Sequence, residues 1–216
     1  MQDPPSRPRF LALGDSYTIG EGVRPEESWP WQLALRLRDH GVPVGDPEIV
    51  ARTGWTSEEL YEEIRMRADI FSAHAPWDLV TILIGVNDQY RGLLPEDYRG
   101  WLAMILDEAV AFGSSAESVL VISIPDWSVT PFADQRDRDA IRAAIERFNE
   151  VNREEAETAG AGWLDITRLS RSAGEDLSLV GEDGLHPTGP MYRRWADLIL
   201  PAALEILAKS GRGVAK

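Results

Sequence analysis

Cysteine is absent from the 216 residues of the chain. Its absence excludes a disulfide framework, a thiol nucleophile and thiolate metal ligands. Cationic side chains are also scarce, because 22 Lys and Arg face 36 Asp and Glu, for a formal net charge of -14. Phosphate binding needs clustered Lys and Arg, so this balance argues against nucleic acid or an anionic membrane surface as a partner.

Long apolar runs are missing as well. No run approaches the roughly 20 residues that cross a bilayer, and the first residues, MQDPPSRPRF, lack the pattern of a signal peptide. We therefore expect a cytoplasmic protein with no membrane span. The length and apolar content predict a single domain over residues 1–216, with residues 1–8 as a disordered lead-in.

Short apolar runs alternate with amphipathic segments along the chain. This alternation predicts an α/β protein, a three-layer α/β/α sandwich around a five-stranded parallel sheet. If the first strand lies between strands two and three, the ends of these three strands are neighbours. Strands are expected at residues 10–13, 48–52, 78–84, 118–124 and 162–166, and helices at 28–40, 57–68, 95–112, 134–158 and 190–208, with Pro201 kinking or splitting the last.

Three strands end in residues that an acyl-transfer site could use. Ser16 follows the first strand, Gly54 the second and Asn87 the third. Carboxyl ends of neighbouring parallel strands meet at one edge of a sheet, where open α/β sheets bind ligands. We therefore expect a hydroxyl, a closely approachable backbone N–H and a side-chain amide to converge there.

A serine nucleophile needs a base, most often a histidine oriented by a carboxylate. The chain has three histidines. His40 falls at a predicted helix end and His74 in an unpatterned stretch, and both are expected on the surface. His186 lies in the sequence DGLHP, where Asp183 precedes it at close spacing. Asp183 and His186 are therefore the candidate partners of Ser16.

The segment GDSYTIG, the isolated Gly54, GVND and DGLHP resemble, in order and spacing, the signature segments of the GDSL/SGNH hydrolase family. The resemblance implies a flavodoxin-like fold and a serine esterase that needs no metal or cofactor. It implies that Ser16 attacks the ester carbonyl, His186 takes the proton and Asp183 orients the imidazole. The backbone N–H groups of Ser16 and Gly54 and the amide of Asn87 would form the oxyanion hole.

Each of these residues also has a structural interpretation. Ser16 could cap the following helix, Gly54 could satisfy a positive φ, and Asn87 could form an Asx turn. Asp183 and His186 could be a loop ion pair. The four segments in register favour the catalytic interpretation.

The substrate is expected to be a small acyl ester. Tyr17, which stands where the family usually has leucine, is predicted to lie near the pocket, together with Trp55 and Trp127. Carbohydrate acetylesterase and lysophospholipase or thioesterase specificities are alternatives.

Other functions fit the sequence less well. A nucleotide-binding site is disfavoured because neither GxGxxG nor GxxxxGK[ST] is present. An α/β-hydrolase is disfavoured because Thr18 stands where its GxSxG elbow needs glycine. A catalytically silent relative that binds a carbohydrate or a protein is the remaining alternative.

Overall fold

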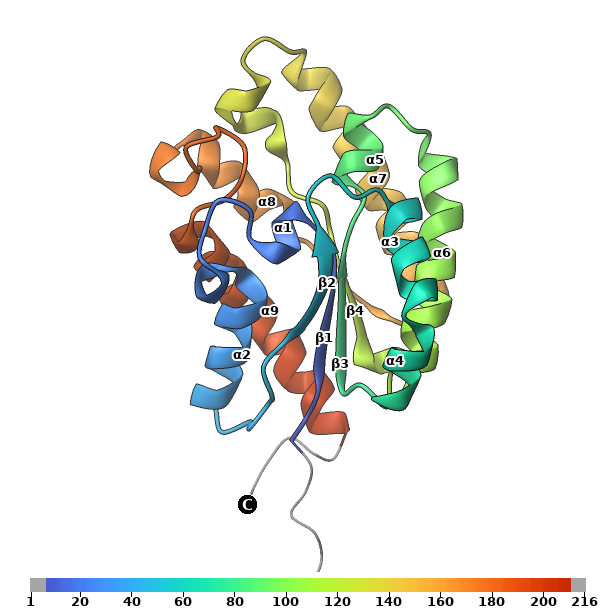
Figure 1. Cartoon of the computed structure of the whole chain (residues 1–216). Helices are drawn as coiled ribbons and strands as arrows, with labels where there is room; N and C mark the ends of the chain where they lie inside the picture. The colour runs from blue at the N-terminus through green and yellow to red at the C-terminus, as the bar shows by residue number, and fades with distance from the viewer. Residues whose placement is uncertain (1–6, 211–216) are drawn as a thin grey trace, which may run out of the picture.

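A computed structural model describes residues 7–210 of the chain (Figure 1). Five strands form one parallel sheet in the order β2-β1-β3-β4-β5. The first strand lies between the second and the third, which is the condition for the ends of these three strands to be neighbours. The strands are β1 (Phe10–Asp15), β2 (Glu48–Arg52), β3 (Leu79–Leu83), β4 (Val119–Ile122) and β5 (Gly162–Leu164).

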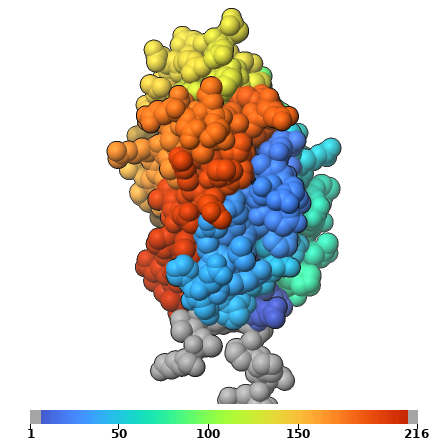
Figure 2. All heavy atoms as spheres, turned by 90° about the vertical axis from the view of Figure 1, so that its left-hand side faces the viewer, coloured from blue at the N-terminus to red at the C-terminus, as the bar shows by residue number. Residues whose placement is uncertain are grey.

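Helices cover both faces of the sheet, which confirms the three-layer sandwich. On one face, α2 (Trp29–Asp39) packs against α9 (Gly189–Lys209), and Figure 2 shows the two side by side at the surface. On the other, α6 (Pro95–Phe112) packs against α3 (Ser57–Met66) and α7 (Arg138–Thr158) (Figure 1). The remaining helices are short: α1 (Ser16–Ile19), α4 (Ala68–Ala73), α5 (Val86–Tyr90), α8 (Thr167–Ser170), and the 3-10 turns η1 (Pro25–Glu27), η2 (Ala116–Ser118), η3 (Trp127–Val129), η4 (Pro131–Ala133), η5 (Arg171–Gly174) and η6 (Leu177–Leu179).

The core lies on both faces of the central strands. Every residue of β1, β3 and β4 is buried, whereas the edge strands β2 and β5 are partly exposed. A strand covered by helices on both faces has no side that water can solvate, so it reads as a continuous apolar run. This burial explains why the apolar runs located these strands from the sequence alone.

Several predicted boundaries differ from the structure. The helix expected from residue 134 begins at Arg138, because the Asp137 carboxylate accepts a hydrogen bond from the N–H of Ala140 and caps it there. The helix after Thr56 ends at Met66, so Ala68 belongs to α4. The last helix runs through Pro201 without splitting, since the carbonyl that proline leaves unbonded belongs to solvent-exposed Asp197.

Residues 1–6 of the predicted lead-in lie outside the described residues, and Arg7 and Pro8 belong to no helix or strand. No helix among residues 7–210 combines the length and apolar character needed to cross a membrane.

Candidate active site

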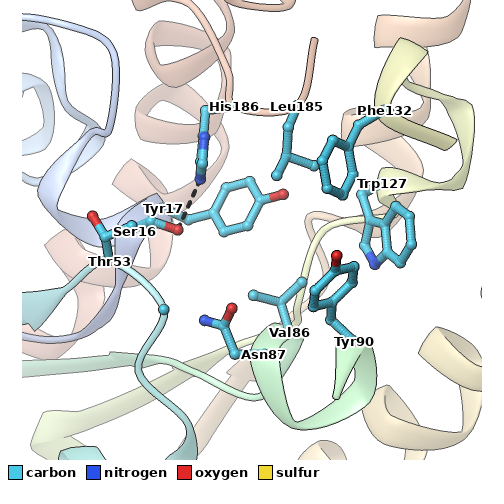
Figure 3. A pocket seen from close by; sticks show the side chains of 11 residues that line it. Ser16, Tyr17, Thr53, Val86, Asn87, Tyr90, Trp127, Phe132, Leu185 and His186 are labelled. Atoms are coloured by element: carbon cyan, nitrogen blue, oxygen red, sulfur yellow. Dashed lines mark hydrogen bonds between the residues drawn. The ribbon is translucent and has the colours of Figure 1, made fainter. Parts of the chain in front are cut away.

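Ser16 lies where β1 gives way to α1. The Asp15 carboxylate accepts a hydrogen bond of 3.0 Å from the N–H of Tyr17 and so caps this short helix. Gly14 leaves no room for a side chain, because a Cβ there would lie 2.5 Å from the carbonyl oxygen of Leu83. The strand end therefore fixes Ser16 closely, and the Ser16 side chain faces a cavity at the carboxyl edge of the sheet (Figure 3).

His186 and Asp183 come from the loop that precedes α9. His186 Nε2 lies 2.9 Å from the Ser16 hydroxyl oxygen, and His186 Nδ1 lies 2.5 Å from Oδ2 of Asp183. The other Asp183 oxygen accepts hydrogen bonds from the N–H groups of Leu185, at 2.9 Å, and His186, at 3.0 Å. With Nδ1–H donated to Asp183, Nε2 is left as the acceptor for the Ser16 hydroxyl. The structure thus brings residues up to 170 positions apart in the chain into one hydrogen-bonded row, Ser16, His186 and Asp183.

Asn87 lies on the side of Ser16 away from His186 (Figure 3), and Gly54 lines the same cavity. Asn87 is the second residue of α5, and its Nδ2 donates a hydrogen bond of 2.9 Å to the carbonyl of Trp55. That bond fixes the amide plane and leaves the second N–H of Nδ2 available. Gly54 turns the chain after β2 with φ +84°, a conformation that suits glycine. Ser16, Gly54 and Asn87 all line the same cavity.

The cavity has a volume of about 160 Å³ and mostly apolar walls (Figure 3). Trp127, Tyr90 and Phe132 form an aromatic wall in which neighbouring ring centroids lie 5.7 to 5.9 Å apart. The guanidinium of Arg136 covers this wall, 4.3 Å from the Phe132 ring centroid. The lining residues are Ser16, Tyr17, Thr53, Gly54, Val86, Asn87, Tyr90, Trp127, Phe132, Leu185 and His186.

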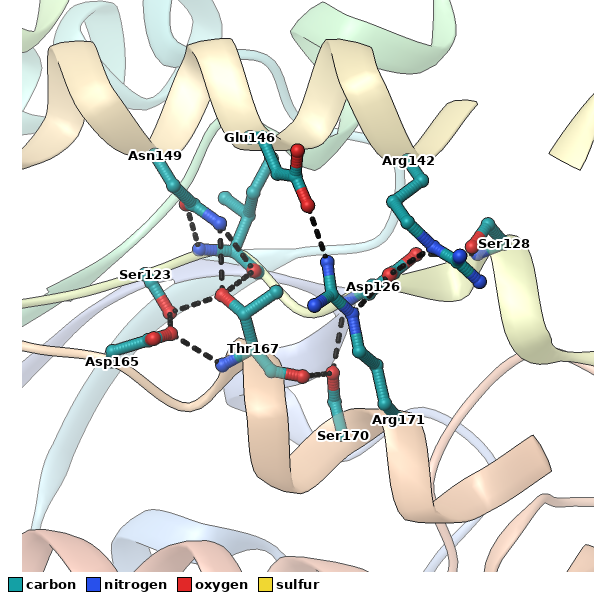
Figure 4. Close-up of polar contacts among 11 residues, drawn as sticks. Ser123, Asp126, Ser128, Arg142, Glu146, Asn149, Asp165, Thr167, Ser170 and Arg171 are labelled. Carbon is teal, nitrogen blue, oxygen red and sulfur yellow. Dashed lines mark hydrogen bonds and ion pairs between the residues drawn. The ribbon is translucent and has the colours of Figure 1, made fainter. Parts of the chain in front are cut away.

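An ion pair between a buried carboxylate and a partly exposed arginine anchors the segment that carries Trp127 (Figure 4). The Asp126 carboxylate is fully buried and lies 2.7 Å from Nε of Arg171. It also accepts a hydrogen bond of 3.0 Å from the N–H of Ser128, while the Asp126 N–H donates to the hydroxyl of Ser170 at 2.9 Å. These contacts on both sides of Trp127 hold the wall of the cavity in place.

Two carboxyl groups near Ser16 have pKa values that are shifted in opposite directions. Complete burial, reinforced by the charge of Asp88, raises the pKa of Asp15 to about 8, against the opposing hydrogen bond from Tyr17. Burial also opposes ionisation of Asp183, but hydrogen bonds from the His186 imidazole and from two backbone N–H groups outweigh it and lower the pKa of Asp183. Asp183 is therefore an anion at neutral pH, and that charge stabilises a protonated His186.

All but one of the predicted site residues lie at the cavity. The residues that converge there are Ser16, Asp183, His186, Gly54 and Asn87, and Tyr17 and Trp127 form part of the cavity wall.

The side chain of Trp55 does not belong to the described cavity wall. Its ring packs against the hydrophobic core instead, and its backbone carbonyl holds Asn87. His40 and His74 are exposed, as predicted, and each ring bonds a carbonyl of its own helix.

Sequence reasoning missed several cavity residues. Val86 and Leu185 adjoin Asn87 and His186, so their place in the signature segments could have indicated them. Tyr90 lies one helical turn after Val86. Phe132 precedes the helix predicted from residue 134, and Arg136, which covers its ring, falls within that predicted helix; no sequence signal singles out either.

A model of the GDSL-like Lipase/Acylhydrolase family matches residues 12–194. The chain belongs to this family. It is accordingly a GDSL/SGNH hydrolase, an enzyme that hydrolyses ester bonds.

Individual relatives agree with the family assignment. A GDSL lipase of Mycobacterium tuberculosis is 28% identical over 199 residues, which cover 88% of this chain and 78% of the lipase. An arylesterase of Vibrio mimicus is 32% identical over 88 residues, 41% of this chain and 42% of that protein. The solved structure of TesA superposes with a TM-score of 0.74 at 24% identity and covers 92% of this chain and 99% of TesA. The similarity to TesA establishes the fold.

Proposed function

We propose that this GDSL hydrolase cleaves small acyl esters through an acyl-enzyme intermediate on Ser16. The observation that carries the proposal is the hydrogen-bonded row of Ser16, His186 and Asp183, which opens directly onto an apolar cavity. A serine hydroxyl is a weak nucleophile at neutral pH, and an adjacent base of this kind activates it. We assign Ser16 as nucleophile, His186 as general base and acid, and Asp183 as the residue that orients and stabilises the imidazole.

Acylation begins when Ser16 Oγ attacks the ester carbonyl carbon. His186 Nε2 takes the hydroxyl proton as the new C–O bond forms, and the carbonyl electron pair moves onto oxygen. The resulting imidazolium is stabilised by the anionic Asp183 on its other nitrogen. His186 then gives its proton to the leaving alkoxide as the ester C–O bond breaks, and the alcohol departs.

The negative charge on the carbonyl oxygen needs donors that are fixed before the reaction. We assign this role to the backbone N–H groups of Ser16 and Gly54 and to Nδ2 of Asn87. The hydrogen bond from Asn87 to Trp55 supports the assignment, because it removes the freedom of the amide to rotate. Donors held in advance stabilise the transition state without a reorganisation cost during the reaction.

Deacylation repeats the chemistry with water as the nucleophile. His186 Nε2 removes a proton from the water as its oxygen adds to the acyl carbon. The proton then returns to Ser16 Oγ as the acyl bond breaks and the acid leaves. The same residues therefore serve both halves of the reaction.

The cavity indicates the size of the ester. An apolar protein cavity of about 150 Å³ holds one benzene molecule, and the cavity beside Ser16 measures about 160 Å³. It therefore suits a substituent of roughly six heavy atoms. Among p-nitrophenyl esters we expect kcat/KM to be highest for short acyl chains such as butanoate and to fall for dodecanoate.

The decisive experiment compares wild-type protein with Ser16→Ala on p-nitrophenyl butanoate. We expect the variant to lose at least a thousandfold in kcat. Ser114→Ala, which changes an exposed serine after α6, is the matched control and should keep the wild-type rate. Equal rates for wild type and Ser16→Ala would support the silent binding relative and refute the proposal.

The base is tested separately with a fluorophosphonate probe. Attack by an activated serine on phosphorus leaves a covalent adduct that mass spectrometry locates on Ser16. His186→Ala should slow labelling strongly, because the hydroxyl then has no proton acceptor. Unchanged labelling of His186→Ala would show that another group activates Ser16.

A further inference from the structure

The hydroxyl of Tyr17 stands out among the polar groups of the cavity. The side chain of Tyr17 is 97% buried, with 3% exposed, and its hydroxyl points into the cavity (Figure 3). The other lining hydroxyls are engaged, since Ser16 bonds His186, Thr53 bonds Glu21 and Tyr90 accepts from Arg136. The Tyr17 hydroxyl forms no hydrogen bond with another group among residues 7–210, and it is not one of the fully buried unpaired polar atoms, so it stays accessible from the cavity.

Packing fixes the direction of the Tyr17 ring. Its centroid lies 5.1 Å from that of the His186 ring and 6.1 Å from that of the Trp195 ring. A buried ring packed against both neighbours cannot swing its hydroxyl away without disturbing their packing. The hydroxyl therefore stays directed at whatever occupies the cavity.

The hydroxyl also remains a donor at all working pH values. Burial, together with the negative charges of Asp15 and Asp183, raises the pKa of Tyr17 further above its ordinary value. The group is thus a neutral O–H surrounded mainly by apolar walls. An apolar substituent that filled the cavity would leave this O–H unpaired, and an unpaired buried donor is unfavourable.

We propose that Tyr17 is a specificity-determining residue whose O–H donates a hydrogen bond to an oxygen atom in the ester substituent that enters the cavity. The enzyme then prefers esters whose short substituent carries an ether or keto oxygen over apolar esters of the same shape. This inference rests on the proposed ester hydrolysis at Ser16. The cavity volume limits the size of the ester substituent, and the hydrogen bond from Tyr17 adds that this substituent carries an oxygen acceptor.

The test compares pairs of esters in which an oxygen replaces a carbon group of similar size. For the acyl side, the pairs are p-nitrophenyl methoxyacetate with butanoate, and 4-oxopentanoate with 4-methylpentanoate. For the alcohol side, 2-methoxyethyl acetate is paired with butyl acetate, and acid release is followed in a pH-stat. Inductive effects on reactivity are the same for each enzyme, so they cancel when the ratio of kcat/KM within a pair is compared between variants.

Tyr17→Phe removes only the hydroxyl and keeps the ring contacts with His186 and Trp195. We expect it to lower the oxygenated-to-apolar ratio by about three- to tenfold, the range for one hydrogen bond. The change should occur in the pairs on one side of the ester, and that side identifies the substituent that the cavity holds. Tyr90→Phe is the matched control, because the Tyr90 hydroxyl already bonds Arg136. It should leave the ratios unchanged whatever it does to individual rates.

Two outcomes would overturn the inference. Ratios that Tyr17→Phe leaves unchanged in every pair would reduce Tyr17 to a packing residue. If Tyr17→Phe and Tyr90→Phe lowered the oxygenated-to-apolar ratio equally, the preference would not depend on the Tyr17 hydroxyl in particular. Neither outcome affects the proposed function, which fails only if Ser16→Ala keeps wild-type activity.

Discussion

The main-chain N–H of Phe132 donates a hydrogen bond of 2.9 Å to the carbonyl oxygen of Gly184. Phe132 belongs to the aromatic wall of the cavity, and Gly184 lies between Asp183 and His186. One hydrogen bond thus connects the wall that would contact the substrate to the loop that carries the proposed base. A change that moves either segment is transmitted to the other.

Gly184→Ala should disturb this connection. Gly184 has φ +71°, and an added Cβ would lie 3.3 Å from Cβ of Pro131 and 3.6 Å from N of Phe132. The left-handed conformation alone costs a residue with a side chain about 1 kcal/mol or more. We expect the loop to shift and kcat/KM to fall by roughly 10- to 100-fold, mainly in kcat, because small displacements of a general base are costly.

The control for this variant is Gly41→Ala. Gly41 has φ +82°, and an added Cβ would meet no described atom within 4 Å. It carries the same backbone strain after α2, away from the cavity. Steady-state kinetics should therefore show a loss for Gly184→Ala alone, and equal kinetics for the two variants would contradict the coupling.

Asn87→Ala tests the proposed oxyanion hole. The Asn87 amide is fixed by the Trp55 carbonyl, so its remaining N–H is available before the substrate arrives. Loss of one such donor typically reduces kcat by about 100-fold or more and affects KM little. Asn87→Asp keeps the size but places an acceptor there, and should be at least as impaired. If both variants kept kcat and raised KM, Asn87 would be a binding residue.

Some features of the fold follow from local sequence. The buried strands read as apolar runs because helices cover both of their faces. Thr56 and Glu59, spaced as in a capping box, form one at the start of α3, with each side chain bonded to the other's backbone N–H. Ser16, Asp183 and His186 could be assigned to one site because each lies in a short signature segment next to a predicted strand or helix.

Other features depend on tertiary packing that no local pattern encodes. The backbone N–H of Phe132 bonds the carbonyl of Gly184, 52 residues away, and this contact places Phe132 at the cavity. The guanidinium of Arg136 then packs over the Phe132 ring. Trp55 was expected in the pocket because it follows Gly54, but neighbours in sequence can face different ways, and its ring packs on the core. Adjacency could not distinguish it from Tyr17, whose ring does face the cavity.

Asp15→Asn should change the pH dependence of stability. The pKa of Asp15 is about 8 in the folded protein, far above the ordinary value, so the folded state binds a proton that the unfolded state loses near pH 4. The unfolded state therefore binds fewer protons between about pH 4 and 8, and the free energy of unfolding falls as pH rises through this window.

Urea denaturation at pH 5, 6, 7 and 8 measures this effect. Asp15 contributes at most about 1.4 kcal/mol per pH unit to the fall in the free energy of unfolding. Asp15→Asn should lack this contribution. The free energy of unfolding of the variant should therefore rise with pH relative to that of the wild type. Part of the slope should remain, because burial also raises the pKa of Asp88. Parallel curves for the two proteins would show that Asp15 is ionised in the folded state throughout.

Arg171→Met should destabilise the fold more than Arg142→Met. Both guanidinium groups face the fully buried carboxylate of Asp126, but Arg171 Nε lies 2.7 Å from it and Arg142 Nε lies 3.6 Å from it. Removing a close partner leaves a buried charge uncompensated, which costs several kcal/mol when the pair is fully buried. Arg171 is 35% exposed, so we expect a loss of about 2 kcal/mol in the free energy of unfolding.

Methionine suits this comparison because it keeps much of the apolar stem of arginine and removes the charge. The longer Arg142 contact should be worth less than about 1 kcal/mol, since Arg171 still neutralises Asp126 in that variant. Urea denaturation of both variants at one pH gives the two losses directly. Equal losses would mean that Asp126 is held by the total positive charge around it, and the wall at Trp127 would then depend on both arginines alike.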